Sequence, residues 1–158
     1  MPNRPHITTV LSLSLLILLG AIGGCTSQSV TLQPPGDSDD PLEMINGLGN
    51  ELSEARGQEV HILSPEWFEK AQKSYIDAKQ GLESGKALSA VINHIATAEA
   101  QLQRARTVSD LSRDTLADAI EARTMARKAG ATSFSKDYAK VENTFLDLTR
   151  AVEKNKLK

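Results

Sequence analysis

The chain has 158 residues, of which 40% are hydrophobic and only 4% aromatic, and its formal net charge is −2. The near balance of charge excludes the strongly basic face of a nucleic-acid binder, and a single cysteine excludes a disulfide framework within the chain. A core with so few aromatic side chains has to be built from aliphatic residues and alanine.

Residues 1–24 have the build of a secretory signal peptide. Arg4 supplies a positive charge ahead of the apolar segment 10–19, and small residues follow that segment. About ten apolar residues are too few for a comfortable membrane span, which needs roughly twenty. The segment therefore predicts export and cleavage.

The end of this segment, Ile22-Gly23-Gly24-Cys25, resembles the lipobox of bacterial lipoproteins. The resemblance implies that Cys25 becomes the first residue of the mature chain and carries lipid that anchors it to a membrane. A free thiol or an intermolecular disulfide is the alternative for a lone cysteine. Thr26 stands where an aspartate tends to retain such proteins at the inner membrane, so we expect the outer membrane, with the protein facing the periplasm.

Residues 25–41 are predicted to form a flexible acidic linker after the lipidated cysteine. Positions 26–41 hold three prolines, one glycine, three aspartates and no basic residue. Such a segment buries little apolar surface to offset the entropy lost on ordering. An ordered loop is the alternative.

Residues 42–158 are predicted to be all-α, an antiparallel bundle of three to four helices. The first helix follows Pro41 and ends near Arg56-Gly57, although Gly47 and Gly49 weaken it. Its apolar residues recur at spacings of three and four, as on one helix face; they are Leu42, Ile45, Leu48, Leu52 and Ala55.

A second helix is predicted to start at Ser64-Pro65, with Ser64 as the N-cap and Leu63 packing on Phe68 as a hydrophobic staple. Gly85 is its expected end. Its apolar stripe comprises Phe68, Ala71, Tyr75, Ala78 and Leu82.

The alanine-rich stretch 86–129 contains no proline and no glycine, which favours helix throughout. We expect a break at 109–114, where capping residues compete with the helix backbone; one unbroken helix is the alternative. The first stripe is Leu88, Val91, Ile92, Ile95, Leu102 and Ala105. The second stripe is Leu116, Ala119, Ile120, Ala122, Ala126 and Ala129, and it ends before Gly130.

The last helix is predicted to start near Ser133 and to carry the clearest heptad stripe in the chain. This stripe is expected to face the core of the bundle. It comprises Phe134, Tyr138, Val141, Phe145, Leu148 and Val152.

No motif for catalysis or cofactor binding is present in the sequence, which lacks a Gly-rich phosphate loop, HExxH and Gly-x-Ser-x-Gly. His61 lies in a predicted loop, and His94 has no metal-ligating partner on its helix face. Asp114, Asp118 and Glu121 fit a solvated, ion-paired surface better than an acid–base site. We therefore expect no enzymatic activity, no cofactor and no metal.

Two residues are candidate contact points. Trp67, the only tryptophan, either covers an end of the bundle, which we favour, or anchors a partner. The cationic C-terminus either complements a helix dipole, which we favour, or joins Lys158 to peptidoglycan, in similarity to the small major lipoprotein whose last lysine is attached to the wall.

From Ser64 onward the chain resembles a helical bacterial envelope domain of unknown function that often precedes an OmpA-type peptidoglycan-binding domain. The segments that carry the resemblance are SPEWFEKAQKSYIDAKQGLESGK, AEAQLQRA, ARTMARKAGA and DYAKVENTFLDLTRAVEK. The resemblance implies an outer-membrane lipoprotein with a periplasmic helical module. No OmpA-type domain follows before Lys158, so we expect no non-covalent wall binding by such a domain.

Three functions remain open on this basis. A structural or adaptor lipoprotein would bind another envelope protein or its own copy through its helix faces. A peptidoglycan tether or spacer would act through the C-terminal lysine region. An enzyme or ligand carrier would use a pocket between helices, and is the least favoured of the three.

Overall fold

The computed structural model describes residues 40–156, so the predicted signal peptide, Cys25, most of the linker and Lys158 lie outside it. Within this range the chain is all-α, with no strand. The elements are α1 (Pro41–Gly57), α2 (Val60–Leu63), α3 (Pro65–Glu83), α4 (Leu88–Thr115), α5 (Ala117–Lys128), a 3-10 turn (Ala131–Ser133) and α6 (Ser135–Glu153).

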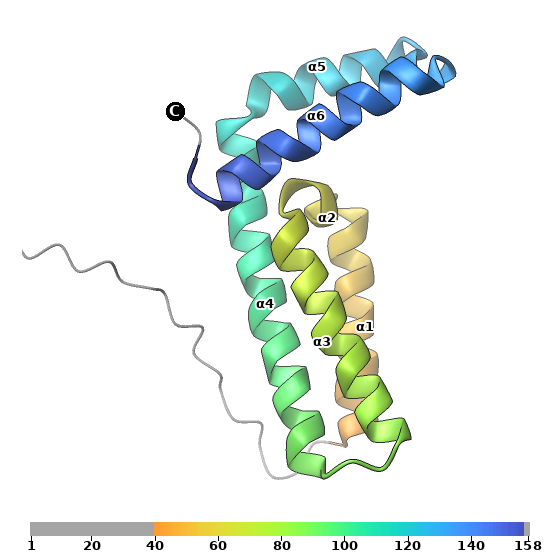
Figure 1. Ribbon diagram of the computed structural model, residues 1–158, viewed down its shortest axis with the longest axis vertical. Coiled ribbons are helices and arrows are strands. Elements are labelled where there is room, and N and C mark those ends of the chain that lie inside the picture. Colours follow the sequence, from red (N-terminus) through yellow and green to blue (C-terminus); the bar gives the residue numbers. More distant parts are fainter. Residues whose placement is uncertain (1–39, 157–158) are drawn as a thin grey trace, which may run out of the picture.

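Helices α1, α3 and α4 stand side by side and alternate in direction, with the short α2 joining α1 to α3 at one end (Figure 1). Helices α5 and α6 leave this upright bundle and cross that same end, forming what we call the α5–α6 arm (residues 117–153). This architecture confirms the predicted all-α antiparallel bundle. No helix between residues 40 and 156 is both long and apolar enough to cross a bilayer.

The core lies between α1, α3 and α4 and is made of aliphatic side chains and alanine, as the composition suggests. Phe68, which is 2% exposed, is the aromatic residue at its centre, and Trp67 and Tyr75 pack against it from partly buried positions. Small side chains at the contact positions let the helices approach closely. Five alanines are completely buried there: Ala55, Ala71, Ala78, Ala98 and Ala105.

Helix α1 forms over the predicted range in spite of its two interior glycines, Gly47 and Gly49. Asp40 caps it, because its carboxylate accepts a hydrogen bond from the Leu42 amide at 2.9 Å. Gly49 has a packing role, since a Cβ at this position would lie 2.9 Å from the hydroxyl of Tyr75 on α3. The close approach of α1 and α3 therefore accounts for one of the two glycines.

The break after α4 lies later than predicted. Helix α4 runs unbroken through residues 109–114, and the chain turns at Leu116 instead. Ser112, one of the residues expected to disrupt the helix, is fully buried and its hydroxyl donates a hydrogen bond of 2.7 Å to the carbonyl of Leu63. Because this hydroxyl has a tertiary partner, it does not compete with the helix backbone.

The apolar stripes of the arm are only partly buried, which corrects the prediction that they form core. Phe145 and Val152 in the second half of α6 are buried, whereas Val141 is 52% exposed and Phe134 is 70% exposed. Ala122 on α5 is also exposed. The reason is the turn at Leu116, which carries these helix faces across the end of the bundle, where no other helix of the described part of the chain covers them.

Candidate functional site

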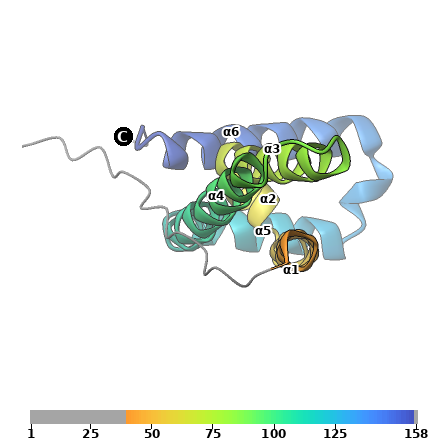
Figure 2. The same ribbon diagram turned by 90° about the horizontal axis from the view of Figure 1, so that it is seen from below.

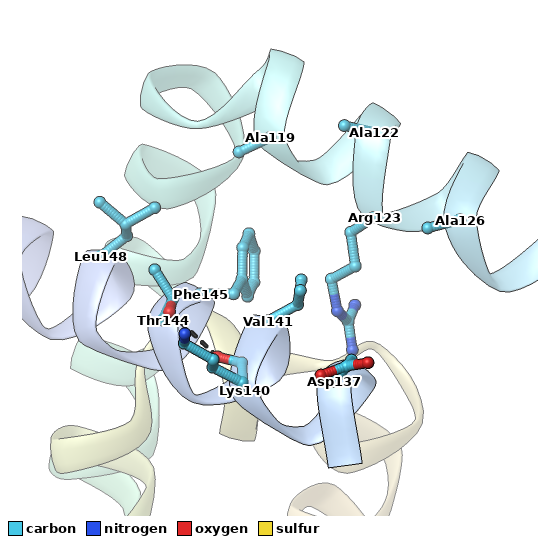
Figure 3. Close-up of a pocket in the computed structure, with 10 residues that line it drawn as sticks. All are labelled: Ala119, Ala122, Arg123, Ala126, Asp137, Lys140, Val141, Thr144, Phe145 and Leu148. Atoms are coloured by element: carbon cyan, nitrogen blue, oxygen red, sulfur yellow. Dashed lines mark hydrogen bonds between the residues drawn. The ribbon is translucent and has the colours of Figure 1, made fainter. Parts of the chain in front are cut away.

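An open groove of about 670 Å³ lies between α5 and α6. Figure 3 shows Val141 and Phe145 pointing from α6 toward α5, while Arg123 reaches from α5 toward α6. From below the bundle the two helices run along opposite margins of the molecule (Figure 2). The lining residues are Ala119, Ala122, Arg123 and Ala126 from α5, and Asp137, Lys140, Val141, Thr144, Phe145 and Leu148 from α6.

Each wall of the groove is a single helix face. The alanines of the α5 wall are spaced by three and four residues, and the apolar residues of the α6 wall follow the same rule. Methyl groups make the α5 wall shallow, while Val141, Phe145 and Leu148 give the α6 wall its bulk. The arrangement suits close packing of an apolar helix or chain against both walls.

Arg123 closes one side of the groove and ties the arm to the bundle. Its side chain is only 7% exposed, and its Nε and Nη2 atoms each donate a hydrogen bond of 2.8 Å to the two carboxylate oxygens of Glu142 on α6. Its Nη1 atom lies 3.3 Å from the carboxylate of Glu59, in the turn after α1. The guanidinium also stacks 5.2 Å from the ring centre of Phe145. One buried cation thus joins three parts of the chain.

The charges of this cluster are matched. The hydrogen bond from Arg123 lowers the pKa of Glu142 and outweighs the opposite effect of burial. Bonding to Glu142 likewise raises the pKa of Arg123. Partial burial, with a hydrogen bond to Glu142, raises the pKa of the Tyr138 hydroxyl. Because the carboxylates of Glu59 and Glu142 already pair with the Arg123 guanidinium, this cation is not available to bind an anionic ligand in the groove.

A second hollow of about 600 Å³ lies on the other side of α5, against the turn between α1 and α2. Arg113 contributes to its lining and donates a hydrogen bond of 2.6 Å to the carbonyl of Gln58. Arg113 also pairs with Asp110 at 2.9 Å. Its polar contacts are therefore internal, and the apolar groove of the arm is the stronger candidate.

Trp67 lies on α3 away from the groove. It is partly buried against the core, and two cations lie over its ring: Lys70 at 4.1 Å and Arg104 at 5.9 Å from the ring centre. Its backbone amide donates a hydrogen bond of 3.2 Å to Glu153.

The remaining predicted candidates are dispersed. Asp114 ends up on α4, whereas Asp118 and Glu121 follow the break at Leu116 and lie on α5. Within residues 40–156, no group of three or more His, Cys, Asp or Glu side chains could hold a metal ion.

The two histidines among the described residues lie apart from the groove. His94 is on α4, and His61 is part of the short helix α2 rather than a loop. The Nδ1 atom of His61 is buried without a hydrogen-bond partner. Burial, followed by the charge of Arg56, lowers the pKa of this side chain.

Sequence reasoning missed the groove although it identified the stripes that line it. The spacing of Ala119, Ala122 and Ala126 predicted core, because periodicity shows which residues share a face but not whether another helix covers that face. The ion pairs of Arg123 with Glu59 and Glu142 join residues far apart in the chain, so no local sequence pattern predicts them. No family model matches the chain, and comparisons with curated proteins and with solved structures find no match either.

Proposed function

We propose that this protein is a lipid-anchored adaptor of the bacterial cell envelope that docks another polypeptide in the groove of the α5–α6 arm. Lipid on Cys25 holds it at the outer membrane, facing the periplasm, in keeping with the lipobox-like sequence that ends at Cys25. The observation that carries the adaptor role is the groove itself, two largely apolar helix faces between which no segment of residues 40–156 is packed.

The position of the arm fits such a role. The described chain starts at Asp40, at the end of the bundle opposite the arm (Figure 1). Helix α1 has 17 residues and so spans about 25 Å at 1.5 Å per residue. A lipid anchor joined to this end through the linker would present the groove on the side of the domain away from the membrane.

The lining of the groove favours packing over bond-making chemistry. Its walls are mostly alanine and aliphatic or aromatic side chains, and its buried cation, Arg123, is satisfied by Glu142 and Glu59. A nucleophile activated by a neighbouring base is not among the residues that line it. An adaptor role therefore explains the groove better than an enzyme does.

A peptidoglycan tether is the second candidate. Lys156, the last described residue, lies at the arm end of the molecule, opposite the start of α1 (Figure 1). An anchor at one end and a wall attachment at Lys158 would let the bundle span the space between membrane and wall. Mass spectrometry of lysozyme-digested walls decides this, because the tether requires a muropeptide on Lys158.

Metabolic labelling with palmitate tests the anchor. We expect label in the wild-type protein and in Thr26→Asp, but none in Cys25→Ser, which should leave the membrane fraction. Thr26→Asp should keep its lipid and move to the inner membrane, so it separates anchoring from sorting. A Cys25→Ser protein that sediments with membranes as fully as the wild type contradicts the proposal.

Photo-crosslinking in cells tests the groove. A photoreactive residue introduced at Val141 should crosslink to a stoichiometric partner. The same residue at Leu111, which is equally exposed at 52% but lies on α4, is the control and should not. Equal labelling from both positions, or none from either, contradicts a docking role for the arm.

A further inference from the structure

The turn between α1 and α2 is joined to the arm by ion pairs. The carboxylate of Glu59 lies 3.3 Å from Nη1 of Arg123 and 3.1 Å from Nη1 of Arg127, both on α5. Glu59 itself has a backbone φ of +60°, in the left-handed region that a residue other than glycine seldom adopts. Such a conformation persists where surrounding contacts hold it, and the two arginines contribute such contacts.

His61 lies two residues after Glu59 in α2, the short helix beneath the arm in Figure 1. Its Nδ1 atom is buried and has no hydrogen-bond partner in the described part of the chain. The imidazole ring centre lies 5.9 Å from that of Phe68, and the guanidinium of Arg56 lies 5.3 Å from the centre of the same Phe68 ring. The side chain is thus placed as a neutral ring, between an aromatic neighbour and a cation.

The charges around this turn leave little room for a further cation. A proton on His61 would add a positive charge near Arg56 and Arg123, and Glu59 is the carboxylate that it would meet. That carboxylate already pairs with two arginines, while α3 contributes the uncharged ring of Phe68. The charged groups that contact the turn or act on His61 are Arg56 on α1, Glu59, Arg113 on α4, Arg123 and Arg127 on α5, and Glu142 on α6 through Arg123.

We propose that protonation of His61 releases the turn at Glu59 from α5, so that mild acid frees this side of the arm from the bundle. The imidazolium attracts the Glu59 carboxylate, for which Arg123 and Arg127 compete, and repels the guanidinium of Arg123. Val152 is buried, so the end of α6 stays in place and the change is confined to α5 and the tip of the arm. The proposal depends neither on the lipid anchor nor on what binds the groove.

The direction of the pH dependence follows from proton linkage. Burial, followed by the charge of Arg56, lowers the pKa of His61 from its ordinary value of 6.5 while the arm is attached, and release of the arm restores that value. Attachment is therefore independent of pH above about 6.5 and weakens as pH falls toward the lowered pKa. Because a single proton is taken up, release becomes favoured by at most about tenfold per pH unit.

Hydrogen exchange of the full chain, followed by mass spectrometry from pH 7.5 to 5.5 and corrected for the intrinsic effect of pH, tests this proposal. A detached helix of 12 residues is marginal in water, so the amides of α5 should lose protection by up to about tenfold per pH unit. The amides of α3 should keep theirs. His61→Gln should abolish the pH effect, whereas His94→Gln, the same replacement on α4, should retain it.

A second variant separates the ion pairs from the histidine. Glu59→Gln removes the carboxylate that holds Arg123 and Arg127, so α5 should exchange fast at pH 7.5 and respond little to acid. Circular dichroism of each variant checks that the helices are retained. The Glu59 and His61 variants together show whether one event, release of this turn, accounts for both effects.

Three outcomes overturn the proposal. The first is an α5 whose protection does not change between pH 7.5 and 5.5 in the wild type. The second is an acid effect that persists in His61→Gln, which would assign it to carboxylates such as Glu142 instead. The third is a parallel loss of protection in α3 and α5, because it would mean that the whole domain unfolds rather than that the arm is released.

Discussion

The carboxylate of Glu153, at the end of α6, accepts a hydrogen bond of 2.7 Å from the hydroxyl of Ser64, at the start of α3. The same carboxylate accepts hydrogen bonds from the backbone amides of Glu66 and Trp67 at 3.1 and 3.2 Å. Ser64 was predicted to cap α3 with its own side chain, but its hydroxyl accepts no hydrogen bond from the backbone amides of α3. It donates instead to Glu153, whose carboxylate accepts those amide hydrogen bonds. The N-terminus of α3 is thus capped by a side chain from the arm.

Removing this cap should destabilise the protein. Glu153→Ala deprives two backbone amides and the buried Ser64 hydroxyl of their acceptor, so we expect it to lower the free energy of unfolding by about 1–3 kcal/mol. Urea denaturation followed by circular dichroism measures the effect. Glu83→Ala, at an exposed position at the end of α3, is the control and should change stability by less than about 0.5 kcal/mol.

Phe145, within α6, and Phe134, just before its first residue, should respond differently to truncation to alanine. Phe145 is 5% exposed, and Phe145→Ala should cost about 3–5 kcal/mol through lost burial and a cavity. Phe134→Ala should have little effect on the monomer, because that side chain is already 70% exposed. Thermal unfolding of both variants provides the comparison, and equal melting temperatures for Phe145→Ala and the wild type contradict its place in the core.

The Arg123–Glu142 pair should make stability depend on pH in the acid range. The pKa of Glu142 is lowered in the folded protein, so its contribution is fully present above the pKa of an unfolded glutamate, about 4.3, and is lost as pH falls through the folded value. We expect Glu142→Gln to be less stable than the wild type at neutral pH by about 1.5–3 kcal/mol, the usual worth of a hydrogen bond to a charged group.

The difference between Glu142→Gln and the wild type should be constant from pH 7 down to roughly pH 5 and should shrink below about 4.3. Urea titrations at several pH values measure it. Glu121→Gln, an exposed position on the same arm, serves as the control and should track the wild type. A Glu142→Gln difference that grows as pH falls would be the wrong sign for a carboxylate held ionised by Arg123.

Gly47 and Gly49, the two interior glycines of α1, offer a matched pair. A methyl group added at Gly47 would have nothing within 4 Å, so Gly47→Ala should stabilise the protein by about 0.5–1 kcal/mol. Gly49→Ala should gain less or lose stability, since its Cβ would meet the hydroxyl of Tyr75 at 2.9 Å. Adding Tyr75→Phe to Gly49→Ala removes that hydroxyl and should restore the gain in stability. Chemical denaturation measures the free energy of unfolding of these variants and the wild type. Equal changes for Gly47→Ala and Gly49→Ala would contradict this account.

Local sequence patterns were enough to predict the long helices α1, α3 and α6, but not the short α2 or the position of the break between α4 and α5. The period of apolar residues indicated α1, α3 and α6, and Gly85 and Gly130, with φ of +68° and +83°, end helices where glycine was expected to. These features depend on interactions within a few residues of the chain. The prediction of an all-α bundle with an aliphatic and alanine core follows from the same information.

Only the tertiary structure decided which helix faces are covered. The turn at Leu116 carries α5 and the first half of α6 across the end of the bundle. Val141 and Phe145, four residues apart, both line the groove there, but Val141 is half exposed while Phe145 is buried. The capping of α3 by Glu153 and the link from Arg123 to Glu59 and Glu142 likewise join distant segments. Periodicity fixes the direction in which a side chain points from its own helix, whereas burial depends on what the rest of the chain places there.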